Sequence, residues 1–560
     1  MTDGLAEFQE RQAIAAALEE TGSLLELKGE NRFRVRAFRT AARALAGFGG
    51  SLRSGLEDGS LARTRGIGPV TLAIIAELLR TGRASLLDDL REEIPAGLVR
   101  LIEGAGLSVT RAQLIHERLG IETVEELEAA ALDGRLAALP RFGAKTAAGI
   151  VKAIADRREA SRYRLLHRAL AEAETLRSAL RQLPGVLRVE AAGEVRRSME
   201  VVSELVMVIV TEDARALERG LGPVAGARLV VATPATAGAA LLTATGSDDH
   251  LRGLGERAAA LGLALADGAL TRGGTALPAP DETAVYAALD LPVIPPELRE
   301  GRGEIELAAR GTLPILVERG DLRGCLHCHT RASDGTNTIE QLAVASRKAG
   351  YQWLGITDHS QAAAYAGGLR PEQLLRQLEE IDRLNDELAG IRILKGIEAD
   401  ILQDGAIDYD DHLLARLDFV IGSVHSRFGM AADARAMTAR ILAAMDSPFL
   451  TILGHPTGRL LLSRDPYEVD LDAVIARAAE RGVAIEINGD PHRLDLDWRH
   501  LARARAAGVA ISIGADAHSL AGIGNMEFGL AMARKGGLAA GDVLNTLSAD
   551  EFLAFARRRR

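Results

Sequence analysis

Histidines crowd the carboxy-terminal part of this chain, and their placement constrains the fold more than any other feature. All but His116, His167 and His250 of the 12 histidines in 560 residues lie after residue 326. Six of them follow apolar runs typical of buried strands, such as YQWLGIT, FVIGSV and AISIG. Helical stretches separate these runs, so the pattern predicts a parallel β/α barrel. Because such barrels gather the residues that follow their strands at one mouth, we expect these histidines to share a pocket.

Three carboxylates accompany the six histidines. His327 and His329 are two residues apart, so on a strand both imidazoles point to the same face. The complete predicted ligand set is His327, His329, Asp334, His359, Glu398, His425, His455, Asp516 and His518. Imidazoles and carboxylates suit zinc, manganese or iron. Nine ligands are too many for one ion, so we expect two or three divalent ions (Mn²⁺, Zn²⁺ or Fe²⁺) that share Glu398 as a bridge and hold a phosphodiester.

The bulk properties predict a cytoplasmic protein without a membrane span. The first residues, MTDGLAEFQERQ, do not resemble a secretory signal, and no apolar run reaches the roughly 18 residues that a span needs. The two cysteines, Cys325 and Cys328, fit a reducing compartment, and their spacing lacks the second pair that a zinc knuckle requires. A net charge of −10 argues against nucleic-acid binding by bulk electrostatics, so any DNA contact should depend on local patches.

The first 160 residues show the apolar spacing of helices. Two segments, LARTRGIGPVTLAIIAELL and LAALPRFGAKTAAGIVKAI, are typical of helix-hairpin-helix units, whose turns expose backbone N–H groups at the start of a helix. We expect phosphate contacts at Gly66, Gly68, Gly143 and Lys145. A tight turn without a ligand is the alternative. The arginine-rich segment 31–53 is open to two interpretations, a phosphate-binding face or a solvated helix face.

Six motifs of the last 240 residues resemble those of the PHP domain: HCHT, TDHS, GIEADIL, SVHS, GHPTGRLL and ADAHS. The resemblance implies a distorted (β/α)7 barrel with a trinuclear metal site. By this analogy one ion is held by His327, His329, Glu398 and Asp516, a second by Glu398, His425 and His455, and a third by Asp334, His359 and His518. We expect His425 or Asp516 to assist proton transfer, and the sequence does not choose between them.

Two longer segments, GHPTGRLLLSRDP and EINGDPHRLDL, further resemble the PHP domain attached to bacterial family X DNA polymerases, and residues 1–320 resemble the rest of such a polymerase. The resemblance implies that Arg459 and Arg493 contact substrate phosphate, with ion pairing as the alternative. It divides the chain into helical domains with helix-hairpin-helix units at 1–85 and 86–160, an α+β nucleotidyltransferase-like palm and thumb at 161–295, a linker at 296–320 and the PHP domain at 321–560.

The palm departs from the family pattern. A family palm strand reads approximately G-S-x-R-R-x-K-E-T-x-G-D-x-D, whereas AAGEVRRSMEVVSELVMVIV places Glu204 and Val206 at the two metal-binding aspartates. Counting back from the TGS at Thr245 places Arg228 at the third carboxylate. Because nucleotidyl transfer needs two magnesium ions held by carboxylates, we expect polymerase activity to be absent or very weak. Ile74 stands where the family's lyase lysine belongs, so we expect no lyase activity in that domain.

These patterns together predict a family X homologue that has lost synthesis and keeps a DNA-binding frame and a metal-dependent 3′-5′ exonuclease. We expect a monomer that acts in DNA repair on gapped or 3′-recessed duplex DNA. Three alternatives stay open: an active family X DNA polymerase, a small-molecule phosphatase of the histidinol-phosphatase type, and a DNA-binding scaffold with an inert barrel.

Overall fold

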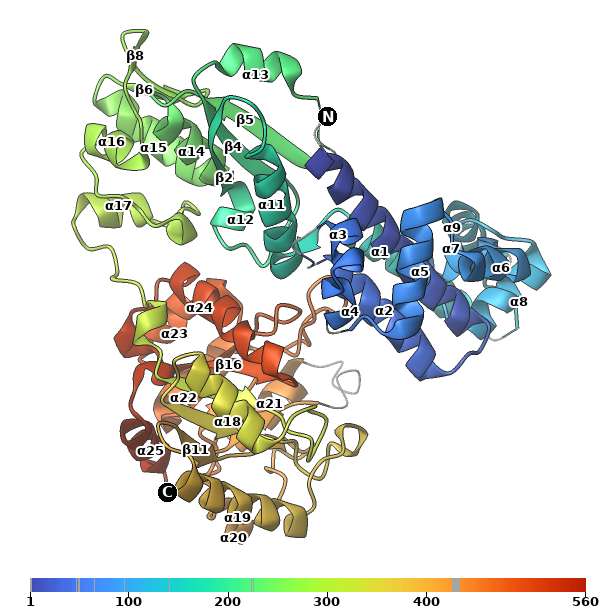
Figure 1. Cartoon of the computed structure of the whole chain (residues 1–560). Coiled ribbons are helices and arrows are strands. Elements are labelled where there is room, and N and C mark those ends of the chain that lie inside the picture. The colour runs from blue at the N-terminus through green and yellow to red at the C-terminus, as the bar shows by residue number, and fades with distance from the viewer. Residues whose placement is uncertain are drawn as a thin grey trace. The chain divides into compact units, whose positions relative to one another are not determined.

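The computed structural model describes residues 3–46, 48, 51–64, 66–94, 96–140, 142–222, 224, 226–425 and 434–560. The chain forms two compact units (Figure 1). We call them the amino-terminal unit, Met1–Val195 with Val201–Ala240, and the carboxy-terminal unit, Arg196–Glu200 with Leu241–Arg560. Each is described by itself.

Within the described part of residues 1–160, the regular elements are all helices, as the apolar spacing predicts. They are α1 (Asp3–Leu27), α2 (Arg32–Ala46), α3 (Leu52–Glu57), α4 (Ser60–Arg63), α5 (Pro69–Thr81), α6 (Ser85–Glu93), α7 (Ala96–Ala105), α8 (Val109–Leu119), α9 (Val124–Leu132) and α10 (Ala144–Ala160). One apolar core forms around Leu18, Phe38 and Ile75, and a second around Leu101 and Ile115. The helical prediction for this region is confirmed.

The glycine turns of both helix-hairpin-helix segments lie at helix starts. Gly68 precedes α5, and Gly143 precedes α10 with a left-handed φ of +75°. Lys145 is exposed in the first turn of α10. A Cβ at Gly66 would lie 3.0 Å from Thr40 Cγ2, so close packing on α2 accounts for this glycine. Phosphate contact at these positions stays a prediction.

Several arginines of segment 31–53 are paired with acids. Arg39 Nη2 lies 2.6 Å from Glu26 Oε2, and Arg53 Nη2 lies 2.6 Å from Glu10 Oε1. These exposed ion pairs favour the solvated-face interpretation of the segment.

A small mixed sheet completes the amino-terminal unit and confirms the predicted α+β module. The elements of this module are β1 (Arg164–Leu165), α11 (Leu166–Leu180), β2 (Val186–Ala192), α12 (Gly193–Arg196), β3 (Val201–Val202), β4 (Leu205–Thr211), α13 (Ala214–Gly220) and β5 (Ala227–Ala232), of which β1 and β3 form a separate antiparallel pair. The sheet order is β2-β4-β5, with β4 antiparallel to β2 and parallel to β5. Val206 and Arg228 are register partners, so two of the three predicted palm positions are neighbours.

Helices and a three-stranded sheet form the segment that precedes the barrel. They are α14 (Ala237–Thr245), α15 (Asp248–Ala260), β6 (Ala264–Ala266), β7 (Ala269–Arg272), β8 (Thr275–Leu277), α16 (Glu282–Ala288), η1 (Pro296–Leu298), α17 (Glu304–Ala309) and η2 (Arg319–Asp321). The expected linker 296–320 is tied to the barrel: Arg534 Nε lies 2.7 Å from Glu297 Oε1, and Val317 N–H donates to Leu538 O.

The barrel sheet is parallel throughout, in the order β11-β10-β9-β16-β15-β14-β13-β12. Its strands are β9 (Gly324–Cys328), β10 (Trp353–Ile356), β11 (Arg392–Lys395), β12 (Glu398–Asp400), β13 (Ile421–Ser423), β14 (Ile452–Leu453), β15 (Ala484–Asn488) and β16 (Ile511–Ala517). Only Gly396 and Ile397 separate β11 from β12, and the bridge between His359 and Glu398 continues the pairing with β10. The two are halves of one interrupted strand, so the sheet follows the seven strand paths of the expected distorted barrel.

The helices of this region are α18 (Ile339–Lys348), α19 (Pro371–Glu387), α20 (Asp411–Leu414), α21 (Ala434–Ala444), α22 (Leu471–Arg481), α23 (Trp498–Ala506), α24 (Met526–Lys535) and α25 (Ala549–Arg557), with the 3₁₀ turns η3 (Ala364–Ala366), η4 (Leu520–Asn525), η5 (Ala540–Asp542) and η6 (Leu544–Thr546). Phe419 fills the interior beside the strand break, where a Cβ at Gly396 would lie 2.4 Å from its ring. Within the described part of the chain, no helix has the length and apolar character to cross a membrane.

Candidate metal centre

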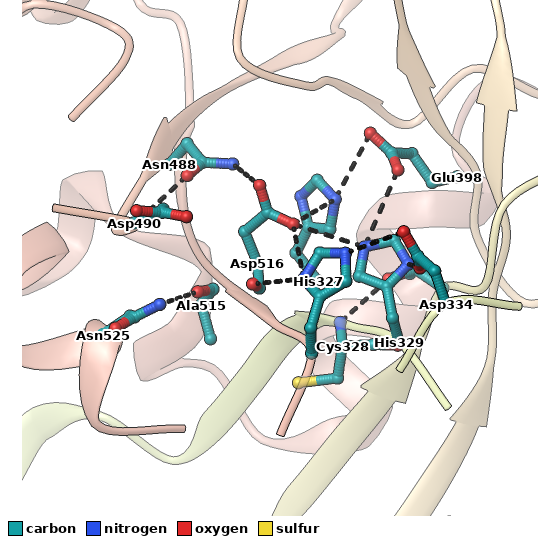
Figure 2. A network of polar contacts seen from close by, with 12 residues as sticks. His327, Cys328, His329, Asp334, Glu398, Asn488, Asp490, Ala515, Asp516 and Asn525 are labelled. Carbon is teal, nitrogen blue, oxygen red and sulfur yellow. Dashed lines mark hydrogen bonds and ion pairs between the residues drawn. The ribbon is translucent and has the colours of Figure 1, made fainter. Parts of the chain in front are cut away.

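All nine predicted ligands lie in barrel strands or in the loops that follow them, and their ligand atoms come together in overlapping groups, a cluster that we call the pocket (Figure 2 labels His327, His329, Asp334, Glu398 and Asp516). Three of these residues, His327, His455 and Asp516, have positive φ angles of 60°, 23° and 46°. Backbone in this region is uncommon outside glycine and clusters at functional sites. The left-handed turn at His327 falls within the irregular pairing of β9, so its side chain reaches the pocket by a bend as well as by strand alternation.

The ligand atoms form four overlapping groups, within each of which the atoms lie no more than 4.8 Å apart. The groups are His329, Asp334, His359 and His518; His327, Glu398 and His455; His327, His329 and Asp516; and His359, Glu398 and His425. The overlap means that neighbouring ions would share ligands. His329 belongs to two groups: one with His327 and Asp516, the partners that the resemblance implies, and one with Asp334, His359 and His518.

Glu398 occupies the centre of the pocket. Its Oε1 lies 2.9 Å from His455 Nε2 and 3.1 Å from His425 Nε2, and its Oε2 lies 2.9 Å from His359 Nδ1. The carboxylate is 1% exposed. Its two oxygens thus face different imidazoles, which is the arrangement that a bridging carboxylate needs.

Several buried polar atoms of the pocket make no hydrogen bond of good geometry among the described residues, although charged neighbours lie within 4 Å of them: His327 Nε2, both ring nitrogens of His329, His359 Nδ1 and Glu398 Oε2. Leaving a buried polar atom unpaired costs about 1–3 kcal/mol. Five such atoms in one pocket, all of types that bind metals, are explained together by divalent ions. The residues present therefore fit a metal cluster.

The electrostatics of the pocket also demand positive charge. Burial alone would raise the pKa of Glu398, but the imidazoles of His425, His327 and His359 hold it well below its usual value. Burial alone would lower the pKa of His359 and His425, but Glu398 and neighbouring carboxylates raise it to about 10 and about 9. Without ions, His359 and His425 hold protons, whereas burial lowers the pKa of His329 to about 4 and also lowers that of His455. Bound divalent cations would supply the positive charge instead.

Two buried carboxylates form hydrogen bonds with candidate ligand residues. Glu486 Oε1 accepts a hydrogen bond of 2.5 Å from His327 Nδ1, and its Oε2 accepts one of 2.8 Å from the backbone N–H of His455. Asp400 Oδ1 accepts a hydrogen bond of 2.6 Å from His425 Nδ1. Such partners fix the orientation and basicity of metal-binding imidazoles. Glu486 is not among the predicted site residues, although an acid inside the apolar run VAIEIN is a signal for a buried role.

The two arginines predicted to contact phosphate lie in different surroundings. Arg459 pairs with Asp497 and donates to the carbonyl oxygens of Arg493 and Leu494, which favours the ion-pair alternative for it. Arg493 Nε lies 3.4 Å from Asp516 Oδ2, at the edge of the ligand cluster.

Asn488 also contacts the carboxylate of Asp516. Its Nδ2 donates to Asp516 Oδ2 at 3.0 Å (Figure 2).

The three palm positions form a different kind of site. Glu204 Oε2 accepts a hydrogen bond of 2.9 Å from Arg228 Nε, and the two side chains are 48% and 50% exposed. Val206 is buried, and it is the register partner of Arg228 in the sheet. Glu194 takes the place of the serine in the family pattern, and its Oε2 accepts hydrogen bonds from the Ser203 N–H and hydroxyl. The palm therefore neutralises its remaining carboxylate with a cation of its own.

Family models match four segments of the chain. They are a helix-hairpin-helix domain at residues 9–84, a SAM-like helix-hairpin-helix tandem at 98–156, a DNA polymerase beta thumb at 240–300 and a PHP domain at 326–489. The PHP match ends before β16, so Asp516 and His518 join the pocket through the pairing of β16 with β9 and β15.

Curated relatives of two kinds resemble the chain. The DNA polymerase/3′-5′ exonuclease PolX of Bacillus subtilis is 34% identical over 578 aligned residues, which cover 98% of this chain and 99% of the relative. Probable phosphatases of Syntrophotalea carbinolica and Caldicellulosiruptor saccharolyticus are 31% and 33% identical over 165 residues, which cover 29% of this chain and 64% of each relative. The first likeness spans the whole chain, and the second is partial on both sides.

Proposed function

Since the chain belongs to the PolX family of bacterial DNA polymerase/3′-5′ exonucleases, we propose that its barrel hydrolyses the terminal phosphodiester at DNA 3′ ends and that its palm no longer synthesises DNA. The convergence of nine metal-binding side chains with unpaired buried atoms in the PHP barrel carries this proposal. A scaffold with an inert barrel would have no reason to keep such a costly arrangement.

The nine proposed ligands would hold two or three divalent ions, with Glu398 as a bridge and Mn²⁺, Zn²⁺ or Fe²⁺ as the candidates. The overlapping groups support more than one ion, because a single ion could not use all nine side chains. When bound, the ions would polarise the phosphate and lower the pKa of water in the pocket. Arg493, beside Asp516, is placed to neutralise charge on the phosphate.

His425 and Asp516 remain the candidates for moving a proton. Asp400 keeps a proton on His425 Nδ1, which leaves Nε2 directed into the pocket toward Glu398. Asp516 Oδ2 already accepts from Asn488 and faces Arg493. These contacts favour a holding role for Asp516, and His425 Nε2 is free to carry a proton only while it is not bound to an ion.

The proposal that synthesis is lost rests on the pairing of Glu204 with Arg228 and on the valine at position 206. Two magnesium ions need several carboxylate oxygens, and the three family positions of this palm keep one carboxylate, which an arginine already neutralises. Primer extension with the wild type and Glu204→Ala tests it. Extension by the wild type that disappears in the variant would show an active polymerase.

The helix-hairpin-helix and thumb matches support duplex DNA as the partner, and we propose gapped or 3′-recessed ends and a monomeric enzyme. In this scheme the duplex is held by three domains, at residues 1–85, 86–160 and 161–295. The linker 296–320 joins them to the PHP domain, residues 321–560, which cleaves the 3′ end. Gly68, Gly143 and Lys145, which lie at helix starts, are the proposed phosphate contacts.

Hydrolysis of a small phosphomonoester is the second candidate, because a relative named as a probable phosphatase aligns with this chain over 165 residues at 31% identity. The family likeness over 98% of the chain favours the nuclease. Rates on a 3′-recessed duplex and on a phosphomonoester, measured with the same Mn²⁺-loaded protein, separate the two. Turnover of the phosphomonoester alone would reject the nuclease.

The decisive experiment measures release of the 3′-terminal nucleotide in Mn²⁺ by the wild type, His329→Ala and His412→Ala. His412 is an exposed histidine on α20 and provides a matched control. We expect activity to disappear only in His329→Ala. An unchanged rate in that variant would remove this pocket from the chemistry.

A further inference from the structure

An exposed aromatic ring stands at the mouth of the metal pocket. Tyr365 lies on η3, in the loop that leads from His359 to α19. Its ring centroid lies 6.3 Å from that of His359 and 6.4 Å from that of His425. Both imidazoles are candidate ligands on either side of Glu398, so the ring borders the place where a phosphodiester would be held.

The loop that carries Tyr365 is firmly hydrogen-bonded. Leu369 N–H donates to His359 O at 2.8 Å, and Ala362 N–H donates to Asp408 Oδ2 at 2.8 Å. A Cβ at Gly368 would lie 1.9 Å from Ser360 O, so the two ends of the loop pack directly on each other. These contacts fix the backbone of the loop that carries the ring.

Tyr365 is unusual among the exposed apolar side chains of the barrel. In the described part of residues 321–560, the other large ones are Val344 and Leu462, at 41% and 38% exposure, whereas Tyr365 is 72% exposed. Aromatic residues make up only 3% of the chain. An aromatic face that is largely exposed, next to the candidate metal pocket, is suited to contact a substrate.

We propose that the ring of Tyr365 stacks on the nucleobase of the nucleotide at the DNA 3′ end while its phosphodiester lies against the metal ligands. This inference rests on the proposed nuclease function and adds a specificity-determining contact to it. Every base offers a π face, so stacking on an aromatic ring accepts all four bases. Small phosphate esters without a base gain nothing from the ring, and the contact therefore favours nucleotides over them.

The test pairs a change in the enzyme with a change in the DNA. Wild type, Tyr365→Ala and Tyr365→Phe are compared on two 3′-recessed duplexes, one ending in thymidine and one in a base-free tetrahydrofuran nucleotide. Since base–aromatic stacking is worth about 1–3 kcal/mol, Tyr365→Ala should lower kcat/KM about 5- to 150-fold on the thymidine end. On the base-free end the loss should be less than about twofold, and Tyr365→Phe should match the wild type on both.

Val344→Ala, which removes an exposed side chain from α18, controls for general effects on the barrel. Equal losses on the two duplexes in Tyr365→Ala would overturn the stacking proposal while the nuclease stands. Failure of the wild type to cut either duplex would instead count against the nuclease function.

A binding measurement tests the same contact without catalysis. A duplex with 2-aminopurine at its 3′ end, joined by a phosphonate linkage that is not hydrolysed, is titrated with Zn²⁺-loaded protein, because stacking on an aromatic ring quenches its fluorescence. We expect quenching by the wild type and Tyr365→Phe, and none by Tyr365→Ala at saturating protein. Quenching that survives in Tyr365→Ala would reject the contact.

Discussion

The palm and the barrel each keep a glutamate where family resemblance places a metal-binding carboxylate, and their surroundings are opposite. Glu398 is buried among imidazoles, whose ring nitrogens in part lack any other partner among the described residues. Glu204 is half exposed and hydrogen-bonded to Arg228. The difference teaches that a carboxylate marks a metal site only where its own chain has not already neutralised its charge.

The energetic reason follows from solvation. An ion pair such as Glu204–Arg228 at a solvated surface contributes about 0–1 kcal/mol and leaves nothing for a cation to gain. A buried carboxylate surrounded by neutral imidazoles is strongly unfavourable until a positive charge arrives. The barrel therefore binds cations or protons, and the palm needs neither.

The largest expected effect is that of Glu398→Gln, which removes the central charge of the barrel pocket. Loss of several kcal/mol of transition-state stabilisation corresponds to a fall in kcat/KM of about 1000-fold or more. Bound metal, measured by elemental analysis of the purified protein, should fall by at least one ion per chain. Glu204→Gln is the matched control, and an equal loss in both variants would erase the contrast between the two regions.

Glu486→Gln should have an intermediate effect. The substitution keeps the shape of the side chain and weakens its hydrogen bond to His327 Nδ1. Changing a residue that orients a metal ligand typically costs 10–100-fold in metal affinity or activity. Competition with a fluorescent chelator measures the affinity, and Glu480→Gln, an exposed acid on α22, serves as the control. Metal affinity equal to that of the wild type would show that His327 needs no support.

The pH dependence of stability gives a third test. The pKa values of His359 and His425 in the metal-free protein, about 10 and about 9, lie above the ordinary histidine value of about 6.5. Groups with raised pKa values stabilise the fold fully below their unfolded pKa, and this stabilisation is lost as pH rises through the folded pKa. We therefore expect the Tm of metal-free protein to fall between pH 7 and 10.

Saturating Mn²⁺ should largely remove this fall, because neutral imidazoles are then the ligands. Scanning calorimetry with and without a chelator measures both curves. An equal fall in Tm with pH, with and without Mn²⁺, would contradict a site that binds protons and metal ions in competition.

Much of the barrel pocket could be predicted from the sequence, because strand ends of a parallel sheet meet at one mouth. His327 and His329, Glu398, and Asp516 with His518 could each be placed there by counting from an apolar run. The helical start of the chain could likewise be predicted from apolar spacing alone.

Side-chain contacts between residues far apart in the sequence could not be predicted. Glu486 lies 159 positions from His327, and nothing local shows that their side chains meet. The ion pair of Arg459 with Asp497 and the exposed position of Tyr365 also depend on how loops fold back on the barrel. Spacing indicates which side chains share a face, but their hydrogen-bond partners depend on tertiary structure.

The smallest expected effect is that of Arg228→Ala, and it tests the palm side of the comparison. Because the pair with Glu204 is half exposed, the free energy of unfolding should fall by only about 0.2–1 kcal/mol. Nuclease activity should not change, since the substitution leaves the barrel ligands untouched. Primer extension should stay absent, because freeing Glu204 still leaves Val206 unable to bind magnesium. Denaturant titration and a primer-extension assay measure these outcomes. Extension that appears in Arg228→Ala would show that the arginine alone silences the palm, and the contrast with the barrel would then depend on a single removable cation.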